Sequence, residues 1–470
     1  MDLREYLSEE LGYQLPNQDF YARIEEWRQW YRGNVASFHP YRIYNGSAIV
    51  SMRRDTLNMA EKVCSDWANL LLNEKVFIHV DDEGTQAFVD EVLEDNNYWV
   101  CGNEAQEWKS ALGTTAYLPY VVSEGERNIV RIDYVTAERI LPLSWSNGKV
   151  EECAFASERT VDGQSYVYLQ LHVKEGGTYR IYNKLFADEQ GQITEVAING
   201  VRGFEGVVPM VDTGSTRRQF VIDRLNIANY VDPGNPMGVA VFAGAIDALK
   251  GADLVYDSYN NEFLLGKKRI MVKPAAAKHA DTGQPVFDSN DTTFYLLPSD
   301  PTDNDLIREI NMDLRAQDHE VALQNRLNLI SVKCGFGEGH YAFNQSAVKT
   351  ATEVVSENSV LFRNLRKHEI ILESVLTELT RIIVWLGKRF VDAGLDEEAD
   401  VNIQFDDSVI ESAEALRAQA QMEFQLGLID QVEYFMRVNK LGEEEALALA
   451  AKISARKPPP EAPPPWSLGV

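Results

Sequence analysis

The sequence predicts an α+β protein in which two long helices bracket a small β module. Residues 238–265 and 313–329 carry helical patterns on either side of a turn-rich stretch. Residues 116–210 instead alternate short β-prone runs with turns, which is typical of antiparallel strands. A third helical pattern, from residue 350 to about 391, is the longest in the chain. Helices and strands therefore occupy separate parts of the sequence, as α+β proteins require.

Two apolar-faced helices are expected near the N-terminus. Within residues 1–33 an aromatic stripe recurs at helical spacing and ends at Gly33. Its members are Phe20, Ile24, Trp27, Trp30 and Tyr31. Residues 52–74 carry a second broad apolar face and lead into a predicted strand, Val76–Val80. Shorter helices are expected near Thr85–Leu93 and Asn103–Leu112.

The middle of the chain is predicted to be mainly antiparallel β structure. Turn signals such as Ser146-Asn147-Gly148 and Asp162-Gly163 separate the runs. The expected strands are 117–122, 130–134, 150–157, 166–173, 179–185 and 192–196.

The first long helix is expected to open at Pro236, which suits a first helical turn, and to run from Gly238 to Leu265. It would be roughly 40 Å long at about 1.5 Å per residue. Gly266 is the expected left-handed cap, followed by a strand at 270–272. Charged residues fall on several faces of this helix, so a single core does not account for them all. They are Asp247, Lys250, Asp253, Asp257 and Glu262. This distribution favours a ring of side-by-side subunits with one side of the helix facing a wet channel.

A compact β excursion follows, with turn residues and a strand near Thr293–Leu297, and the Asp313–Leu329 helix returns from it. Glycines at 335, 337 and 339 break that helix, and a small polar stretch follows at 344–349. Thr350 and Glu353 stand at capping-box spacing at the start of the longest helix.

The C-terminal part is predicted to hold one strand and a helical block. Val401–Phe405 is expected to close back on the β region. Residues 408–456 form helices divided near Gly427–Asp430 and at Gly442. The proline-rich end from Lys457 is expected to be extended or disordered.

Composition restricts the possible partners. The net charge is −27, which argues against tight binding of nucleic-acid phosphates and suits a surface that nucleic acid passes without sticking. Four widely spaced cysteines are expected to be reduced and mostly buried, as in a cytoplasmic setting. Residues 1–5 lack a signal pattern, and no long apolar run suggests a membrane span, so neither secretion nor insertion is expected.

No catalytic motif stands out, and no cofactor is expected. Gly266-Lys267-Lys268 lacks the spacing of a P-loop, and there is no G-x-S-x-G. The acids of 300–305 lack the glycine and final Glu of a calcium loop, and Cys334 with His340 is too small a set for a metal site. Residues 412–441 resemble a helix–turn–helix but carry too few cations to read DNA.

Several stretches resemble the portal proteins of tailed phages, in the siphophage branch. The resemblance is most specific at 52–75, 236–270 and 344–372, and it covers most of residues 20–450. The motifs that carry it are Trp27, Tyr31 and Arg32 before Gly33, Pro236-Met237-Gly238, residues 245–250, Asp253, Asp257-Ser258, residues 261–263 and Gly266-Lys267-Lys268-Arg269.

The resemblance implies a ring, usually of about twelve subunits, that forms a channel at one capsid vertex. Double-stranded DNA would be packaged and ejected through it, with no enzymatic activity of the ring itself. The implied partners are further copies of the chain, the terminase motor, a head-completion or adaptor protein, and the major capsid and scaffold proteins, without a membrane. The implied location is the virion, with assembly in the host cytoplasm. The implied regions are a wing (1–236), stem helices (237–265 and 313–330), a clip (266–312), a tunnel loop, long helix and wing strand (331–407), a crown (408–456) and a tail (457–470).

Two sets of site residues are predicted. Asn344, Gln345, Ser346 and Lys349 would contact passing DNA in a tunnel loop. Lys267, Lys268, Arg269 and Lys273 would form a basic band between stem and clip, although simple helix-capping charge explains the first two equally well. Two alternatives remain: a capsid connector or scaffold-type protein without a tunnel, and a metal-dependent nuclease, for which no carboxylate cluster is evident.

Overall fold

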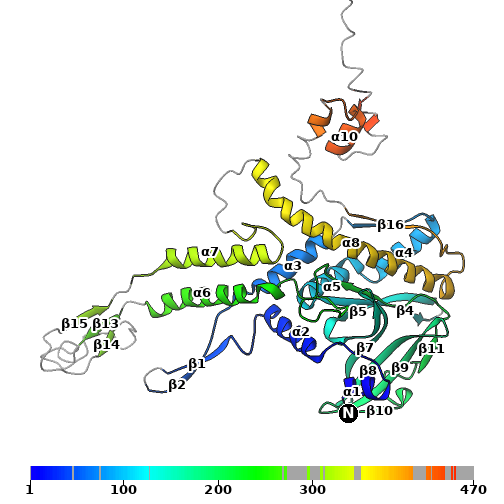
Figure 1. Ribbon diagram of the computed structural model, residues 1–470, viewed down its shortest axis with the longest axis horizontal. Coiled ribbons are helices and arrows are strands. Elements are labelled where there is room, and N and C mark those ends of the chain that lie inside the picture. The colour runs from blue at the N-terminus through cyan, green and yellow to red at the C-terminus, as the bar shows by residue number, and fades with distance from the viewer. Residues whose placement is uncertain are drawn as a thin grey trace, which may run out of the picture. The chain divides into compact units, whose positions relative to one another are not determined.

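The structure is a computed structural model that describes residues 2–44, 47–72, 76–125, 127–266, 269–272, 294–296, 307–310, 313–342, 351–405, 420–424, 426–439, 446–447, 449–450 and 452. The chain divides into two compact units. The first comprises Met1–Ser346 and Arg363–Gln404, and the second comprises Ala347–Phe362 and Phe405–Val470. Figure 1 shows the elements of both units.

Helices near the N-terminus pack around buried aromatic side chains. After α1 (Leu3–Glu5) and a π-helical turn (Tyr6–Glu10), α2 (Gln18–Tyr31), α3 (Met59–Leu71) and α5 (Tyr98–Leu112) contact one another. α4 (Glu83–Asp95) packs against α5. Trp27 and Trp67 are fully buried, and the Phe20 ring meets Trp27 edge-on at a centroid distance of 5.9 Å. Four of the five residues of the predicted aromatic stripe are buried, and Tyr31 is partly exposed.

The β region contains an antiparallel sheet in the order β10-β9-β8-β7-β6, with β11 also paired to β9. The strands are β6 (Ile140–Ser146), β7 (Lys149–Val161), β8 (Gln164–Glu175), β9 (Thr178–Glu189), β10 (Gln192–Val196) and β11 (Met210–Asp212). The predicted turns at Asn147-Gly148 and Asp162-Gly163 are confirmed, with positive φ at both residues of each. β6 was not predicted, because Pro142 interrupts its pattern; as an edge strand it tolerates the missing N–H.

A second sheet has the strand order β12-β4-β5. It pairs β4, the strand that follows α5, with β12, which comes much later in the chain. Its strands are β12 (Val221–Arg224), β4 (Thr114–Glu124) and β5 (Arg127–Thr136). Asp223 of β12 forms a fully buried ion pair with Lys109 of α5 at 3.1 Å and accepts a further hydrogen bond from Gln106 at 2.7 Å. Burial lowers the pKa of Lys109 against the pull of Asp223. This polar centre fixes α5 against β12.

β16 (Val401–Phe405) was predicted to close on the β region and instead pairs with β3 (Val76–Val80) in a sheet of its own. The Asp81 N–H donates to the Asp400 carbonyl at 3.1 Å beside this pair. The prediction was wrong because β3 offers an open edge that its sequence pattern does not reveal.

Two helices flank a small sheet, as predicted. α6 (Ile246–Leu265) and α7 (Ala316–Lys333) pack side by side, with β13, β14 and β15 beyond their ends (Figure 1). β13 (Arg269–Val272) runs parallel to β14 (Phe294–Leu296) and antiparallel to β15 (Ile307–Ile310).

The first of these helices starts later than predicted. Residues 238–242 are not helical, and a single 3₁₀ turn (Ala243–Ala245) precedes α6. Their N–H groups have other partners: Gly238 donates to Thr114 Oγ1 and Val241 to the Ser110 carbonyl, both at 2.9 Å. The backbones also touch, because a Cβ on Gly238 would lie 2.3 Å from the Gly113 oxygen. Gly266 is the C-cap with φ −75°, so the predicted left-handed cap is wrong as well.

The longest predicted helix is confirmed as α8 (Ala351–Phe390), which begins in the second unit and ends in the first. In the second unit, α10 (Gln431–Asn439) follows Gly427, whose φ is +70°. The Asp430 carboxylate accepts the Glu433 N–H at 2.7 Å, so the predicted cap is confirmed.

The structure also contains an unpredicted hairpin, β1 (Pro40–Tyr44) with β2 (Ile49–Arg53). It extends away from the helical body of the first unit (Figure 1).

Candidate functional site

Most of the predicted site residues lie outside the described residues. This holds for Asn344, Gln345, Ser346 and Lys349 of the tunnel loop and for Lys267, Lys268 and Lys273 of the basic band. Arg269 is described: it opens β13 opposite Ile310 of β15 and takes part in a polar contact. The roles of both sets therefore remain predictions.

The tunnel loop is predicted at Gly335–Lys349, and its described part, 335–342, is here named the loop root together with Cys334. The loop root is held by helix α3. Trp67 Nε1 donates to the Cys334 carbonyl at 2.9 Å, and the Trp67 ring lies 5.0 Å from the ring of buried Phe336. His340 stacks on Phe336 at 4.4 Å, and the Tyr341 hydroxyl donates to Asp66 at 2.9 Å.

Helix α8 holds the other side of the loop root. Asn364 Nδ2 donates to the Gly335 carbonyl at 2.8 Å. Gly335 has φ +93°, and a Cβ there would lie 3.1 Å from Asn364 Nδ2 and 3.2 Å from Trp67 Cζ2. The predicted break at glycines 335, 337 and 339 is confirmed, since all three have positive φ. The chain thus enters the loop from a fixed position.

Electrostatics reinforce the loop root. Burial would raise the pKa of Asp66, but hydrogen bonds from His340, Lys62 and Tyr341 outweigh it and lower that pKa. Burial and the Asp66 charge raise the pKa of Tyr341, which therefore stays a hydrogen-bond donor. Beside Trp67, burial and the charge of Lys109 lower the pKa of His368 to about 3. His368 is therefore neutral at pH 7, and its Nδ1 accepts the Asn226 N–H at 3.1 Å.

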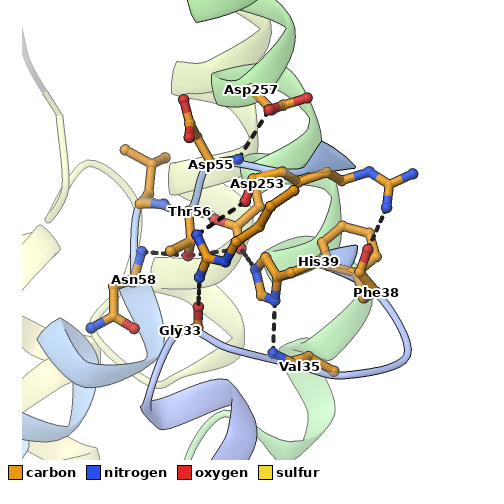
Figure 2. A network of polar contacts seen from close by, with 12 residues as sticks. Gly33, Val35, Phe38, His39, Asp55, Thr56, Asn58, Asp253 and Asp257 are labelled. Atoms are coloured by element: carbon orange, nitrogen blue, oxygen red, sulfur yellow. Dashed lines mark hydrogen bonds and ion pairs between the residues drawn. The ribbon is translucent and has the colours of Figure 1, made fainter. Parts of the chain in front are cut away.

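A second polar network fixes α6 to the base of the β1–β2 hairpin (Figure 2). Asp253 accepts hydrogen bonds from the Leu57 N–H at 2.9 Å and from the Thr56 hydroxyl at 3.0 Å. His39 Nε2 lies 3.2 Å from the same carboxylate. One turn further along α6, Asp257 accepts the Asp55 N–H at 3.0 Å.

The His39 tautomer follows from its second contact. Its Nδ1 accepts the Val35 N–H at 2.7 Å, so the ring proton is on Nε2 and points to Asp253. Burial raises the pKa of Asp253, although the bonds from Leu57, Thr56 and His39 oppose this effect.

These contacts correct the interpretation of the α6 charges. Asp253 and Asp257 are buried, and Glu262 binds Arg315 within the same chain. Of the five charged residues of α6, two have largely exposed side chains: Asp247, which is 99% exposed, and Lys250. The charged residues therefore do not mark a water-facing side of the helix; three of them hold this chain's own segments.

The far ends of α6 and α7 are joined by Glu262. Its carboxylate accepts the Arg315 N–H at 2.9 Å and Arg315 Nε at 2.6 Å, and His319 Nε2 lies 3.5 Å away. The Arg315 N–H, followed by its guanidinium, lowers the pKa of Glu262. These contacts of Glu262 with Arg315 and His319, here named the clamp, hold α6 and α7 together. The clamp lies where the chain passes from α6 into β13 and returns from β15 to α7.

Potential metal-binding side chains are dispersed over the described part of the chain. No group of three or more His, Cys, Asp or Glu is placed there to hold a metal ion, and residues 300–305 lie outside it. All four cysteines are free. Burial raises the pKa of Cys334 to about 12, which keeps it a thiol and a poor ligand. Among these residues no helix is long and apolar enough to span a membrane.

Comparison with known proteins gives one decisive match. The family model described as "Phage portal protein, SPP1 Gp6-like" matches residues 16–457. Among solved structures, a chain from "Virion of native gene transfer agent (GTA) particle" is similar at 9% identity and a TM-score of 0.37, covering 81% of this chain and 88% of that one. No curated protein matches. Since the family model spans nearly the whole sequence, this chain belongs to the SPP1 Gp6-like family of phage portal proteins.

Proposed function

We propose that this protein assembles into a closed ring, of about twelve copies, that forms the DNA channel at one capsid vertex. The single observation that carries the proposal is the portal family match over residues 16–457. A ring built from one repeated heterologous contact closes when the rotation per subunit divides a full turn.

The arrangement of α6, α7 and β13–β15 supports the proposed stem and clip. A helix pair that carries a small sheet at its far end gives each subunit a rod with a docking tip (Figure 1). The terminase motor would dock at this clip, supply the ATP chemistry and later be replaced by a head-completion protein. The capsid and scaffold proteins would surround the wing.

The loop root supports the proposed tunnel loop. A segment that must touch moving DNA needs fixed ends, and Trp67, Asn364 and Asp66 hold the N-terminal one. Within the loop, Asn344, Gln345, Ser346 and Lys349 would make weak contacts of no sequence preference. Few cations are wanted there, because each firmly neutralised phosphate adds a barrier to sliding. The net charge of −27 fits the same requirement.

The loop hypothesis is tested by replacing residues 343–350 with a short Gly-Ser linker, which leaves Phe336, His340 and Tyr341 in place. We expect rings with an axial hole in negative-stain images and a loss of DNA packaging or retention in particles assembled with this variant. A matched control, Ser123→Ala at an exposed site in β4, should package as the unaltered protein does.

Normal packaging by the linker variant would refute the loop's role while leaving the channel intact. Images that show only single compact particles, even at high concentration and with capsid components, would refute the channel itself.

A further inference from the structure

The β1–β2 hairpin exposes apolar side chains on both of its faces. Strand pairing aligns Ile43 with Val50 and Tyr41 with Met52, so these four share one face. Ile43 is 51% exposed, and Val50 and Met52 are also exposed. On the other face Ile49 is 69% exposed. An isolated two-stranded hairpin is marginal in water, and this one leaves its most apolar face uncovered.

The base of the hairpin, in contrast, is firmly held. Arg53 donates to the Gly33 carbonyl at 2.9 Å, the Arg54 guanidinium lies 4.5 Å from the centre of the Tyr41 ring, and Asp257 holds the Asp55 N–H. Asn260 also donates to Asp55 at 2.9 Å. The hairpin is thus an arm with a fixed root on α6 and an apolar surface beyond it.

Helix α7 carries a second uncovered apolar surface, here named the α7 stripe. Val321 is 57% exposed, and two other exposed apolar residues of α7 share its side of the helix, at steps of eight and three residues. The α7 stripe consists of Val321, Leu329 and Val332, with the exposed Asp318 one turn before Val321. Neither the stripe nor the hairpin is covered by the described part of its own chain.

We propose that the hairpin of one subunit packs on the α7 stripe of the next subunit in the ring. This inference rests on the proposed function, since it names the surfaces that the ring contact would use. Two different apolar patches on one chain are what a heterologous contact needs, because each subunit offers an arm and receives one.

Charge favours the same pairing. Residues 40–53 contain Arg42 and Arg53 and no acidic residue, although the chain as a whole carries −27. Helix α7 as a whole carries two acidic residues, one arginine and one lysine. Of these, Asp318 lies on the side of the α7 stripe, so Arg42 of the arm would meet a carboxylate there. Two hairpins facing each other would instead bring like charges together and would stop at dimers.

Cysteine cross-linking tests the pairing directly. In a Cys101→Ser background, whose remaining cysteines are buried, Val50→Cys and Val321→Cys are combined in one chain. A short bismaleimide should give a ladder of covalent species that extends to the full ring. The matched control combines Val50→Cys with Glu158→Cys, an exposed position in β7, and should give no ladder.

Each outcome decides the matter. Mixing chains that carry only one of the two cysteines must give cross-linked dimers, since an internal link would leave monomers and overturn the proposal. Rings seen by electron microscopy without excess cross-linking over the control would overturn the hairpin contact and leave the channel function standing. If the unaltered protein forms no ring under any condition, the proposed function itself fails, and this contact fails with it.

Discussion

Helices α6 and α7 lie side by side, yet they depart from ordinary amphipathic design in opposite ways. α6 turns carboxylates inward: Asp253 is only 4% exposed and Asp257 is buried as well. α7 turns apolar side chains outward at Val321, Leu329 and Val332. The inward carboxylates are satisfied within the chain by N–H and hydroxyl groups of residues 55–57.

This difference separates what a single chain stabilises from what it leaves for assembly. A buried carboxylate with several donors has its cost of desolvation met by its own chain. An exposed apolar stripe has no such compensation until another surface covers it. The carboxylates of α6 therefore belong to the fold of the subunit, although Leu254, Phe263 and Leu264 of this helix are exposed as well. On α7 it is the exposed apolar stripe that offers a surface to a neighbour.

The largest effect is expected when the inward carboxylate of α6 is removed. Asp253→Ala leaves the Leu57 N–H, the Thr56 hydroxyl and His39 without their shared acceptor. We expect a loss of about 3 kcal/mol in the free energy of unfolding, because breaking a buried polar network strands its partners. Urea unfolding measures this loss. Asp247→Ala, at a fully exposed position of the same helix, should change stability by less than about 0.5 kcal/mol.

A second prediction concerns the loop root beside α7. Gly335→Ala places a Cβ between Asn364 and Trp67 on a backbone with φ +93°. We expect a loss of about 2 kcal/mol and faster proteolysis near residues 343–350, since both strain and crowding act there. Gly163→Ala, with φ +81° but open space around it, isolates the backbone strain alone and should cost less.

A substitution in the α7 stripe should weaken assembly while leaving the stability of the single chain nearly unchanged. Val321→Asp changes an exposed side chain, so the free energy of unfolding of the single chain should move by less than about 0.5 kcal/mol. Assembly, measured by light scattering over a concentration series, should need at least about tenfold more protein, which corresponds to about 1.4 kcal/mol per contact. Val321→Thr keeps the shape without the charge and should assemble closer to the unaltered protein. Unchanged assembly of Val321→Asp would show that the α7 stripe faces solvent in the ring.

The smallest expected effect lies at the clamp that joins the two helices. The pKa of Glu262 is lowered in the folded chain, so its contribution to stability is present above the unfolded value of about 4.5 and is lost as the pH falls through the folded value. Glu262→Gln should therefore flatten the decline of the thermal midpoint below about pH 4.5. The change is small because the Arg315 side chain is 68% exposed. Asp247→Asn is the control; an equal flattening there would exclude a specific role for the clamp.

Local patterns in the sequence predicted much of the architecture. The period of the apolar residues located α2, α7 and α8, and the Asn-Gly and Asp-Gly pairs located two of the hairpins in the main sheet. These local patterns failed where contacts between distant parts of the chain determine the structure. Thr56 and Asp253, which meet through a hydrogen bond, are 197 residues apart in the chain, so no window of sequence contains both.

The candidate site likewise has features that the sequence predicts and features that it does not. The glycines at 335, 337 and 339 and the polar stretch at 344–349 indicate a loop from the sequence alone. That Trp67, Asp66 and Asn364 hold its root was not predictable, because α3 and α8 meet it only in the folded chain. The late start of α6 has a similar cause, since the N–H groups of Gly238 and Val241 bond to Thr114 and Ser110.

By itself, the sequence determined the helices and strands whose periodicity is strong, the positions where glycine must interrupt them, and the family to which the chain belongs. Long-range contacts in the folded chain set which charges are buried, where α6 begins and which apolar surfaces remain uncovered. The physical reason is that periodicity is a property of neighbours along the chain. Burial and hydrogen-bond partnership depend on segments that folding brings together from far apart.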